Sequence, residues 1–330
     1  MYRKIYEPRR MLVALASIFL WLVFLIFLQN YQAKTGRKFQ AKREVQISLK
    51  TKSLDVSKFV SAVPLHPRLL IYNRVPKCGS STMIGLLIEL SKLNGFVHLH
   101  SGNYRDIWLN RTVLEHMKLE WLTISKSMRL SYDRHMLYFN LDGFKEGEAA
   151  WMNLVRDPVE RFISRFYYKQ QNEATEVIKN LDSCVDTNVS ECIPATINYT
   201  ESQISYFCGH ELQCLTLEDG WALQKAKANV EKFYSVVGIL EDLHTTFQVL
   251  QHVLPDFFTN YQFTFHGIGR IVANKRSENF QPPVSNVTKK FLRSYLREEI
   301  EFYKFIKRRL YVQAKMIALS TNDTSYDLET

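Results

Sequence analysis

Residues 72–82 read Tyr-Asn-Arg-Val-Pro-Lys-Cys-Gly-Ser-Ser-Thr, and this stretch decides the fold of the chain. It follows the apolar run 69–71 and leads into a second apolar run, a pattern typical of a strand, a turn and a helix in succession. The hydroxyl residues 80–82 can cap the free N–H groups of the helix start. Such a helix start binds anions, and Lys77 adds a full positive charge. The stretch therefore predicts a loop that holds a phosphate-bearing cofactor.

The loop is not a Walker A motif. The glycine four residues before a Gly-Lys pair is missing, and Lys77 precedes Gly79. A kinase or ATPase is therefore disfavoured. Taken alone, the loop is equally consistent with an ordinary capped helix after a buried strand.

A second motif has the same strand, turn and helix pattern. Residues 151–168 read Trp-Met-Asn-Leu-Val-Arg-Asp-Pro-Val-Glu-Arg-Phe-Ile-Ser-Arg-Phe-Tyr-Tyr. Pro158 suits the first turn of a helix, and Asp157 is placed to cap it. Arg156 ends the strand and Ser164 follows about two helical turns later, so the two can hold a second phosphate through charge-assisted hydrogen bonds. An Arg-Asp-Pro turn is commonly structural, and its significance comes from its pairing with the first loop.

Together the two motifs resemble those of a known family. Arg-Val-Pro-Lys-Cys-Gly-Ser-Ser-Thr resembles the loop for the 5′-phosphosulfate of PAPS (3′-phosphoadenosine 5′-phosphosulfate) in Golgi sulfotransferases, and Val-Arg-Asp-Pro-Val-Glu-Arg-Phe-Ile-Ser resembles their 3′-phosphate motif. Within that family the chain resembles the 2-O-sulfotransferase group, which includes the heparan sulfate and uronyl enzymes and the insect protein Pipe. The resemblance extends from about Leu69 to about Ala318.

The resemblance implies a PAPS-dependent 2-O-sulfotransferase that uses no metal. It makes His135 the catalytic base and Lys77 the cation that stabilises charge on the leaving phosphate. Arg74 and His100 correspond to residues that contact the acceptor uronate. The implied cofactor-binding residues are Lys77, Cys78, Gly79, Ser80, Ser81, Thr82, Arg156 and Ser164.

General chemistry supports part of this assignment. Sulfuryl transfer to a hydroxyl needs a phosphate cradle, a base and a cation where charge develops. Histidine is the favoured base near neutral pH. From the residues alone, structural roles stay open for three of the candidates: a core histidine for His135, an ion pair for Arg74 and a surface position for His100. Four other histidines are predicted to be structural or exposed, namely His98, His116, His244 and His252.

The pair Cys78-Gly79 stands where the heparan-acting pattern has Thr-Ala. The cradle loses a hydroxyl at this point, so backbone amides must contribute more of the binding.

The N-terminus predicts a membrane anchor. Residues 11–28 form an uncharged apolar run of 18, just long enough to span a bilayer, and basic residues precede it. A cleaved signal peptide is the alternative, but the run exceeds the usual signal core and no small-x-small site follows. Five sequons lie on the C-terminal side: Asn110, Asn188, Asn198, Asn286 and Asn322. We therefore expect a single-pass type II protein of the Golgi membrane with a luminal catalytic domain.

Five cysteines agree with an oxidising compartment. Their spacing suggests the local disulfides Cys184–Cys192 and Cys208–Cys214 and leaves Cys78 free, and the resemblance implies the same arrangement. A zinc site is the alternative, but no Cys or His pair has the usual ligand spacing.

The net charge of +10 is unevenly distributed. Residues 1–28 carry +3 and residues 29–67 carry +6, which leaves +1 for residues 68–330. An acidic substrate must therefore bind a local patch, and we expect no nucleic-acid partner. The predicted organisation is a cytoplasmic tail at 1–10, the anchor at 11–28, a luminal stem at 29–67, a sulfotransferase domain at 68–320 and a tail at 321–330.

The fold class follows from the order of elements. Strands at 69–71, 152–155 and 236–240 alternate with helices at 81–93, 158–171, 221–233 and 241–254, and one long helix covers 289–318. This order predicts an α/β, P-loop-like sulfotransferase fold with a central parallel sheet flanked by helices. The aromatic stripe of the long helix indicates core or a subunit interface.

The expected acceptor is a glycosaminoglycan or a glycan of a glycoprotein. The resemblance also implies a homotrimer. Two other functions stay open: a Pipe-like enzyme that acts on glycans of specific secreted proteins, and a catalytically inactive Golgi glycan-binding protein.

Overall fold

The computed structural model describes residues 62–103, 106–172, 180–187, 202–215, 220–264 and 282–321. The chain divides into two units, residues 1–55 and 56–330, and all described residues belong to the second. The predicted anchor and most of the predicted stem lie outside the described residues. Within the described ranges, no helix combines the length and the apolar character needed to cross a membrane.

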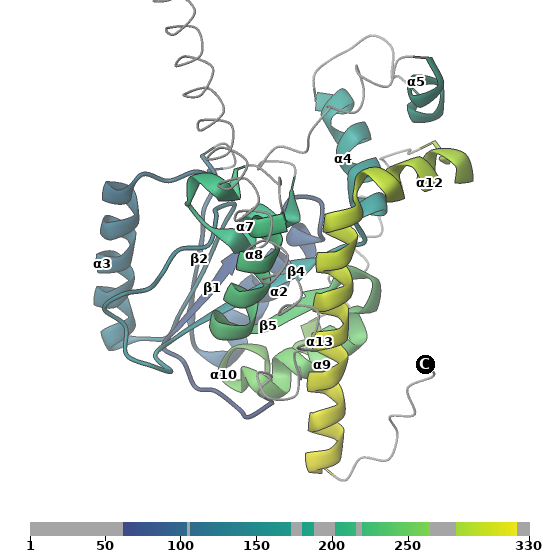
Figure 1. The fold of residues 1–330 in the computed structure, drawn as a ribbon. Helices are drawn as coiled ribbons and strands as arrows, with labels where there is room; N and C mark the ends of the chain where they lie inside the picture. Colours follow the sequence, from purple (N-terminus) through teal and green to yellow (C-terminus); the bar gives the residue numbers. More distant parts are fainter. Residues whose placement is uncertain are drawn as a thin grey trace, which may run out of the picture. The chain divides into compact units, whose positions relative to one another are not determined.

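A five-stranded parallel sheet forms the centre of the described unit (Figure 1). Its order is β2-β3-β1-β4-β5, and every neighbouring pair is parallel. The strands are β1 Leu69–Asn73, β2 Val97–His100, β3 Leu130–Arg134, β4 Ala149–Val155 and β5 Tyr234–Ile239. The parallel sheet and its three predicted strands are confirmed. β2 and β3 were missed because they are short and carry His, Ser, Asp and Arg among their few apolar residues.

Helices flank the sheet. The four predicted helices are present as α2 Ser80–Asn94, α4 Pro158–Asn172, α8 Trp221–Phe233 and α9 Leu243–Val253, the last preceded by the 3₁₀ turn η4 Leu240–Asp242. Five elements were not predicted: α3 Arg111–Ser127, α5 Leu181–Thr187, α7 Gln203–Cys208, η2 Leu212–Cys214 and α10 Pro255–Phe258. Helices α9 and α13 lie against β5, α3 lies against β3 and α2 lies against β2.

The prediction of one continuous helix at 289–318 is wrong. The segment forms two helices, α12 Asn286–Tyr295 and α13 Arg297–Thr321. Leu296 between them leaves helical geometry (φ −93°, ψ 25°), while its side chain is buried in a small apolar cluster with residues of α4 and α12. Glu299, in the first turn of α13, is buried and accepts hydrogen bonds from the start of α7. Tertiary contacts on both sides of Leu296 therefore determine where the helix is interrupted.

An aromatic cluster packs around Trp151 of β4. Trp151 belongs to an aromatic cluster that continues through Phe139 to Trp121 of α3 and through Tyr234 to Phe207 of α7. β5 has one extra residue opposite the Trp151–Met152 step of β4, which shifts the register there. The aromatic residues Phe302 and Tyr303 of α13 are buried in the main core, so the core interpretation of the stripe is confirmed.

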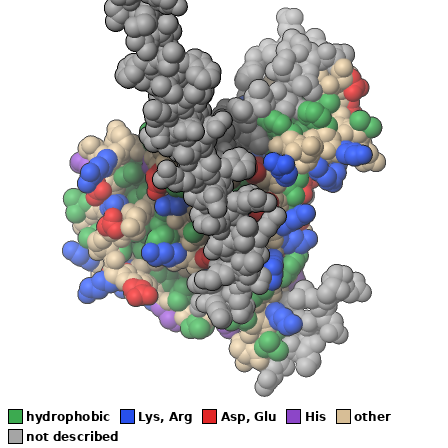
Figure 2. All heavy atoms as spheres, in the orientation of Figure 1, with side chains coloured by type: hydrophobic (Ala, Val, Ile, Leu, Met, Phe, Trp, Pro, Cys, Tyr) green, Lys and Arg blue, Asp and Glu red, His purple; other side chains and the backbone are tan. Residues whose placement is uncertain are grey.

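The carboxyl ends of the strands gather the loops that carry the motifs. Because all five strands run in the same direction, the loops after β1, β2, β3 and β4 leave from one edge of the sheet. This edge holds residues 73–79, 101, 135 and 156. On the face shown in Figure 2, Lys and Arg side chains are interspersed with Asp and Glu, in keeping with the +1 charge of residues 68–330.

The predicted Cys208–Cys214 disulfide is present, and Cys78 is free and buried, as predicted. Cys184 is disulfide-bonded, whereas its predicted partner Cys192 lies outside the described residues. Two sequon residues, Asn110 and Asn286, are exposed at the starts of α3 and α12. The other three, Asn188, Asn198 and Asn322, lie outside the described residues.

A close contact between β5 and α9 gives a test of the fold. A Cβ atom at Gly238 would lie 2.1 Å from Cγ2 of Thr246. We expect Gly238→Ala to lower the free energy of unfolding by about 1–3 kcal/mol, because overpacking a tight core forces side chains out of place. Urea unfolding of the purified protein measures this loss.

Two further variants control that measurement. Thr246→Ser removes the opposing methyl group, so Gly238→Ala should cost less in that background. Gly102→Ala places a Cβ where nothing lies within 4 Å and should leave stability nearly unchanged. Equal stability of Gly238→Ala and Gly102→Ala would contradict the packing described.

Candidate active site

The first motif forms a tight loop between β1 and α2. Lys77 and Gly79 both have left-handed backbone conformations, with φ of 65° and 78°. Gly79 is the N-cap of α2, and a Cβ there would lie 2.6 Å from Cδ1 of Leu240, so a side chain does not fit. No side-chain hydrogen bond caps α2 in the described part of the chain, and its first turn carries no acid. The positive end of this helix is thus suited to an external anion.

Three cations meet at this loop. The Lys77 Nζ atom lies 3.9 Å from the centre of the Tyr168 ring, and Arg156 Nη1 donates to the Lys77 carbonyl oxygen at 3.4 Å. Burial and the nearby charges of Arg156 and Arg165 lower the pKa of Lys77 to about 8. Like charges held this close together are costly unless an anion binds among them. The cluster is therefore an electrostatic site for a polyanion.

Helix α4 supplies one side of this site. Arg161, Ser164, Arg165 and Tyr168 are spaced i, i+3, i+4 and i+7, so they share one helix face. The contact of Tyr168 with Lys77 shows that this face lies along the first loop. Ser164 is buried on it, one helical turn before Tyr168. Arg161, Arg165 and Tyr168 were not selected from the sequence, although their helical spacing was a usable signal.

A buried glutamine joins the two motifs. The Gln203 Oε1 atom accepts from the Arg156 backbone N at 3.1 Å and from the Cys78 Sγ at 3.4 Å, and its Nε2 donates to the Arg156 carbonyl at 3.0 Å. Burial raises the pKa of Cys78 to about 12, so its thiol keeps the proton that it donates. Since the Cys78 thiol points inward, only the backbone of Cys78 is left for an external ligand. Gln203 lies far along the chain from both motifs, and nothing in the sequence around it predicts this role.

The turn after β4 is held from two directions. Asp157 Oδ1 accepts from the backbone N of Val159 and Glu160 at 3.0 and 3.1 Å, which confirms the predicted cap of α4. The Asp157 backbone N donates to Glu241 Oε1 at 2.8 Å, and Tyr303 donates to the other oxygen of Glu241. Arg156 therefore projects from a turn with little freedom to move.

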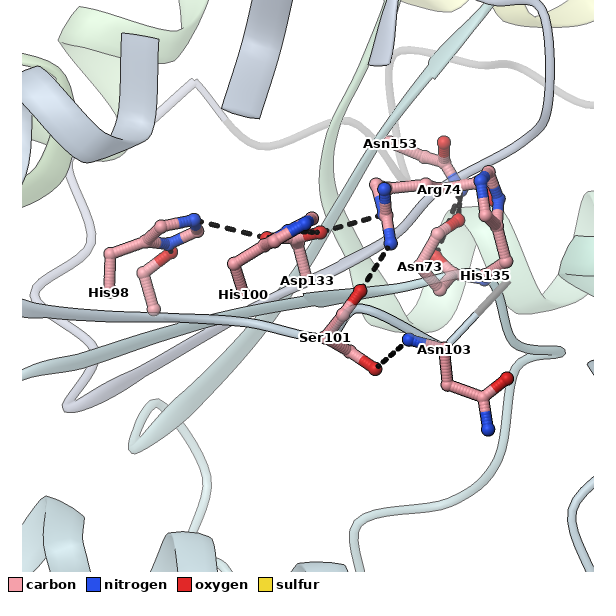
Figure 3. A network of polar contacts seen from close by, with 10 residues as sticks. Asn73, Arg74, His98, His100, Ser101, Asn103, Asp133, His135 and Asn153 are labelled. Carbon is pink, nitrogen blue, oxygen red and sulfur yellow. Dashed lines mark hydrogen bonds and ion pairs between the residues drawn. The ribbon is translucent and has the colours of Figure 1, made fainter. Parts of the chain in front are cut away.

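A second polar cluster lies beside this site at the ends of β1, β2 and β3 (Figure 3). Its centre is Asp133, whose carboxylate is fully buried. Arg74 Nε lies 2.7 Å from Asp133 Oδ1, His98 Nε2 lies 3.0 Å from Oδ2, and His100 Nδ1 lies 3.0 Å from both oxygens. The side chain of His98 is buried in this network, which agrees with a structural role, the first of its two predicted alternatives. Asp133 was not selected from the sequence.

Arg74 is buried, with 1% of its surface exposed. Besides the ion pair with Asp133, its Nη2 donates to the Ser101 carbonyl at 3.0 Å. The ion pair that the residues alone left open is thus present. Contact of Arg74 with an acceptor stays a prediction, as does that of His100, whose side chain is 33% exposed.

His135 lies next to Arg74. Its Nδ1 is 2.8 Å from the Arg74 carbonyl oxygen, which can only accept, so Nδ1 carries the proton and Nε2 keeps a lone pair. Burial and the Arg74 charge lower the pKa of His135 to about 4. The imidazole is therefore neutral at pH 7 and has the form that a general base needs.

The candidate residues thus fall into two adjoining groups. Lys77 and Arg156 meet at the anion site, with Ser164 on the face of α4 that contacts Lys77 through Tyr168. Arg74 and His100 contact Asp133, and His135 bonds to the Arg74 carbonyl. In the described ranges, no group of three or more His, Cys, Asp or Glu side chains is arranged to hold a metal ion.

Comparison with known proteins agrees with this geometry. The model of the sulfotransferase family matches residues 66–306, well over half of the chain. The chain is similar to the uronyl 2-sulfotransferase homolog pip of Drosophila melanogaster, with 33% identity over 272 residues that cover 74% of this chain and 52% of that protein. Uronyl 2-sulfotransferase of Mus musculus is 28% identical over 276 residues, which cover 77% of this chain and 65% of the relative.

Heparan sulfate 2-O-sulfotransferase 1 of Gallus gallus is 26% identical over 250 residues, which cover 72% of this chain and 69% of the relative. The chain thus spans between 52% and 65% of the length of the first two curated relatives. The resemblance to the 2-O-sulfotransferase group is confirmed.

The lowered pKa of His135 predicts a pH dependence of stability. Its value of about 4 lies below the ordinary 6.5, so the folded state binds fewer protons than the unfolded state between these values. This contribution to stability is complete above pH 6.5 and is lost as the pH falls through about 4. Between pH 7 and pH 5 it should lower the free energy of unfolding by about 2 kcal/mol.

Urea unfolding at both pH values measures this difference in the wild type and in His135→Gln. The variant lacks the buried imidazole, so its stability should fall less between pH 7 and pH 5. The same fall in both proteins would show that His135 is not held neutral by the fold.

Proposed function

Because the chain belongs to the sulfotransferase family, we propose that it transfers a sulfuryl group from PAPS to the 2-hydroxyl of a uronic acid in a glycosaminoglycan or related glycan. The names of the relatives, uronyl 2-sulfotransferase and heparan sulfate 2-O-sulfotransferase, support this acceptor class. The observation that carries the proposal is the convergence of Lys77, Arg156 and Arg165 at the start of α2. A nucleotide with phosphate groups at both ends of its ribose is the anion that this arrangement fits.

The residues present fit this donor. Lys77 and the first N–H groups of α2 would hold the 5′-phosphosulfate, and Arg156 with Ser164 would hold the 3′-phosphate. When bound, PAPS supplies an activated sulfuryl group. Burial and the nearby Arg156 and Arg165 lower the pKa of Lys77, and the negative charges of the nucleotide would offset both effects, so binding favours the charged form of Lys77.

The chain supplies two further functions. His135 accepts the proton of the acceptor hydroxyl at Nε2, while the Arg74 carbonyl holds its Nδ1 proton. Lys77 stabilises the negative charge that develops on the leaving phosphate. Arg74 contacts His135, and His100 shares the Asp133 carboxylate with Arg74, so we assign both to the acceptor side of the site.

We also propose that the protein is anchored in the Golgi membrane by residues 11–28 with its catalytic domain in the lumen, and that it forms a homotrimer. The Cys208–Cys214 disulfide and the exposed sequon residues Asn110 and Asn286 support an oxidising, glycosylating compartment. Protease protection of the tagged chain in sealed Golgi vesicles tests the orientation, and sedimentation of the detergent-solubilised chain tests the trimer.

The nucleotide site gives the first functional test. Lys77→Ala and Arg156→Ala should each weaken binding of adenosine 3′,5′-bisphosphate about 10- to 100-fold, because a hydrogen bond to a charged group contributes roughly 1.5–3 kcal/mol. Since the pKa of Lys77 is about 8, wild-type affinity should also fall between pH 7 and pH 9, and Lys77→Ala should lack this decline. Calorimetric titration measures both effects.

Lys92→Ala is the matched control, because Lys92 is an exposed lysine in the last turn of the same helix, paired with Glu89. It should bind the nucleotide as the wild type does. Unchanged affinity of Arg156→Ala would remove the second motif from the site, and stronger binding of ATP than of PAPS would instead favour a kinase.

The assignment of His135 gives the second test. His135→Ala should lose about 10²–10⁴-fold in turnover, the usual contribution of a general base, and should keep its affinity for adenosine 3′,5′-bisphosphate. His116→Ala replaces an exposed histidine of α3 and should keep normal turnover. Incorporation of labelled sulfate into heparan, dermatan and chondroitin chains, followed by disaccharide analysis, measures turnover and identifies the acceptor. Normal turnover of folded His135→Ala would exclude it as the base.

A further inference from the structure

We propose that Asp133 is a positioning residue, and that its buried ion pair with Arg74 orients the imidazoles of both His100 and His135 so that each keeps its lone pair on Nε2. Its catalytic meaning rests on the proposed sulfuryl transfer. Neither the two sequence motifs nor the family resemblance assigns a role to Asp133 or to its third partner, His98.

The position of Asp133 is unusual for a carboxylate. It lies on β3, one strand from the centre of the sheet, and none of its surface is exposed. A buried carboxylate is tolerated only when donors surround it. Asp133 has three: Arg74 Nε at 2.7 Å, His98 Nε2 at 3.0 Å and His100 Nδ1 at 3.0 Å. Figure 3 shows these side chains converging on it from β2 and from the end of β1.

These contacts determine where the protons lie on His98 and His100. A carboxylate only accepts, so the nitrogen that faces it must carry the proton. His98 is therefore protonated on Nε2, and its Nδ1, 3.1 Å from Ser131 Oγ, accepts from that hydroxyl. His100 carries a proton on Nδ1, so the tautomer that this contact selects has its lone pair on Nε2.

Asp133 acts on His135 through Arg74. The Arg74 side chain is fixed by Asp133 on one side and by the Ser101 carbonyl on the other. Its backbone N donates to the Arg134 carbonyl at 2.8 Å, so the residue is held at both ends. The same residue holds His135, because the Arg74 carbonyl accepts from His135 Nδ1 at 2.8 Å.

The imidazoles of His100 and His135 are therefore held in the same way. In each, Nδ1 donates to a fixed acceptor of the protein, and Nε2 keeps the lone pair. An acid that holds one nitrogen of an imidazole so that the other can take a proton is the arrangement found in Ser-His-Asp triads. Asp133 orients the His100 ring directly, and it orients the His135 ring through Arg74. A carboxylate that served only as the counter-ion of Arg74 would contact neither imidazole.

The tautomers can be observed without any change to the network. In the full-length chain labelled with ¹⁵N-histidine, two-bond ¹⁵N–¹H spectra at pH 7 should show His100 and His135 protonated on Nδ1 and His98 on Nε2. His98→Gln, His100→Gln and His135→Gln assign the three signals, and the exposed His116 serves as a reference for an unrestrained ring. A proton on Nε2 of either His100 or His135 would overturn the proposal.

Asp133→Asn tests the functional consequence. The amide has nearly the shape of the carboxylate but turns one acceptor into a donor, so it can no longer receive all three bonds. We expect kcat to fall about 10²-fold, because misplaced catalytic groups lose that much, while affinity for adenosine 3′,5′-bisphosphate stays within about twofold of wild type. The His100 signal should move to the Nε2-protonated form. Asp133→Glu keeps a carboxylate and should recover part of kcat and the wild-type tautomer.

The matched control is Gln313→Met, which removes hydrogen bonds of a fully buried side chain near the amino end of β5. It should lose stability without loss of kcat per folded molecule. If Asp133→Asn behaves in the same way, Asp133 is only structural and the proposal fails. If Asp133→Asn does not fold, the proton positions on His100 and His135 in the wild type test the proposal instead. If the wild type transfers no sulfate, the proposed function fails, while the tautomers still decide whether Asp133 orients the two rings.

Discussion

The buried ion pair between Arg74 and Asp133 constrains the carboxyl edge of the sheet. Removing one partner would leave a buried charge uncompensated, at a cost of several kcal/mol, so both side chains are held in place. The neighbouring Asn73 makes the complementary connection, because its side chain accepts from Asn153 of β4 and Tyr234 of β5 and donates to the Tyr206 carbonyl. Arg74 ties the end of β1 to β2 and β3, and Asn73 ties it to β4 and β5. The position of His135 follows from this junction, since its Nδ1 bonds the carbonyl of Arg74.

The anion site beside this junction differs from it because its charges are not balanced within the protein. Around Asp133 the charges are matched within the protein, whereas around Lys77 burial and the neighbouring charges of Arg156 and Arg165 together lower the pKa of Lys77 to about 8. A matched network holds its geometry without a ligand, and a mismatched one gains stability when a polyanion arrives. The network around Asp133 and the cation cluster around Lys77 can therefore be adjacent and still behave differently: the first is preorganised, and the second gains stability from an anion. Gln203 keeps the two sequence motifs in register by bonding to Cys78 and Arg156 at once.

Local patterns predicted much of the fold. β1, β4 and β5 are apolar runs that end in turn residues, and α2, α4, α8 and α9 have helical periodicity, so each could be recognised without its neighbours. β2 and β3 could not, because their polar residues His98, His100 and Asp133 satisfy one another across strands rather than facing water. The break at Leu296 was equally hidden. The sequence pattern on both sides of Leu296 is typical of a helix. The helix is interrupted only because Leu296 is buried on one side of the break and Glu299 on the other.

The sequence by itself determined the two strand-turn-helix motifs, the parallel sheet and, through the resemblance, the family and the candidate residues Lys77, Arg156, Ser164 and His135. The motifs rest on short-range order: a strand end, a tight turn and a helix start within about ten residues. Only the tertiary structure decided which residues support them. Asp133, His98 and Gln203 lie far along the chain from the side chains that they hold, and nothing in their immediate sequence marks them. A buried polar group takes whatever partner the fold brings within hydrogen-bond distance, and that choice is made by strand order and packing.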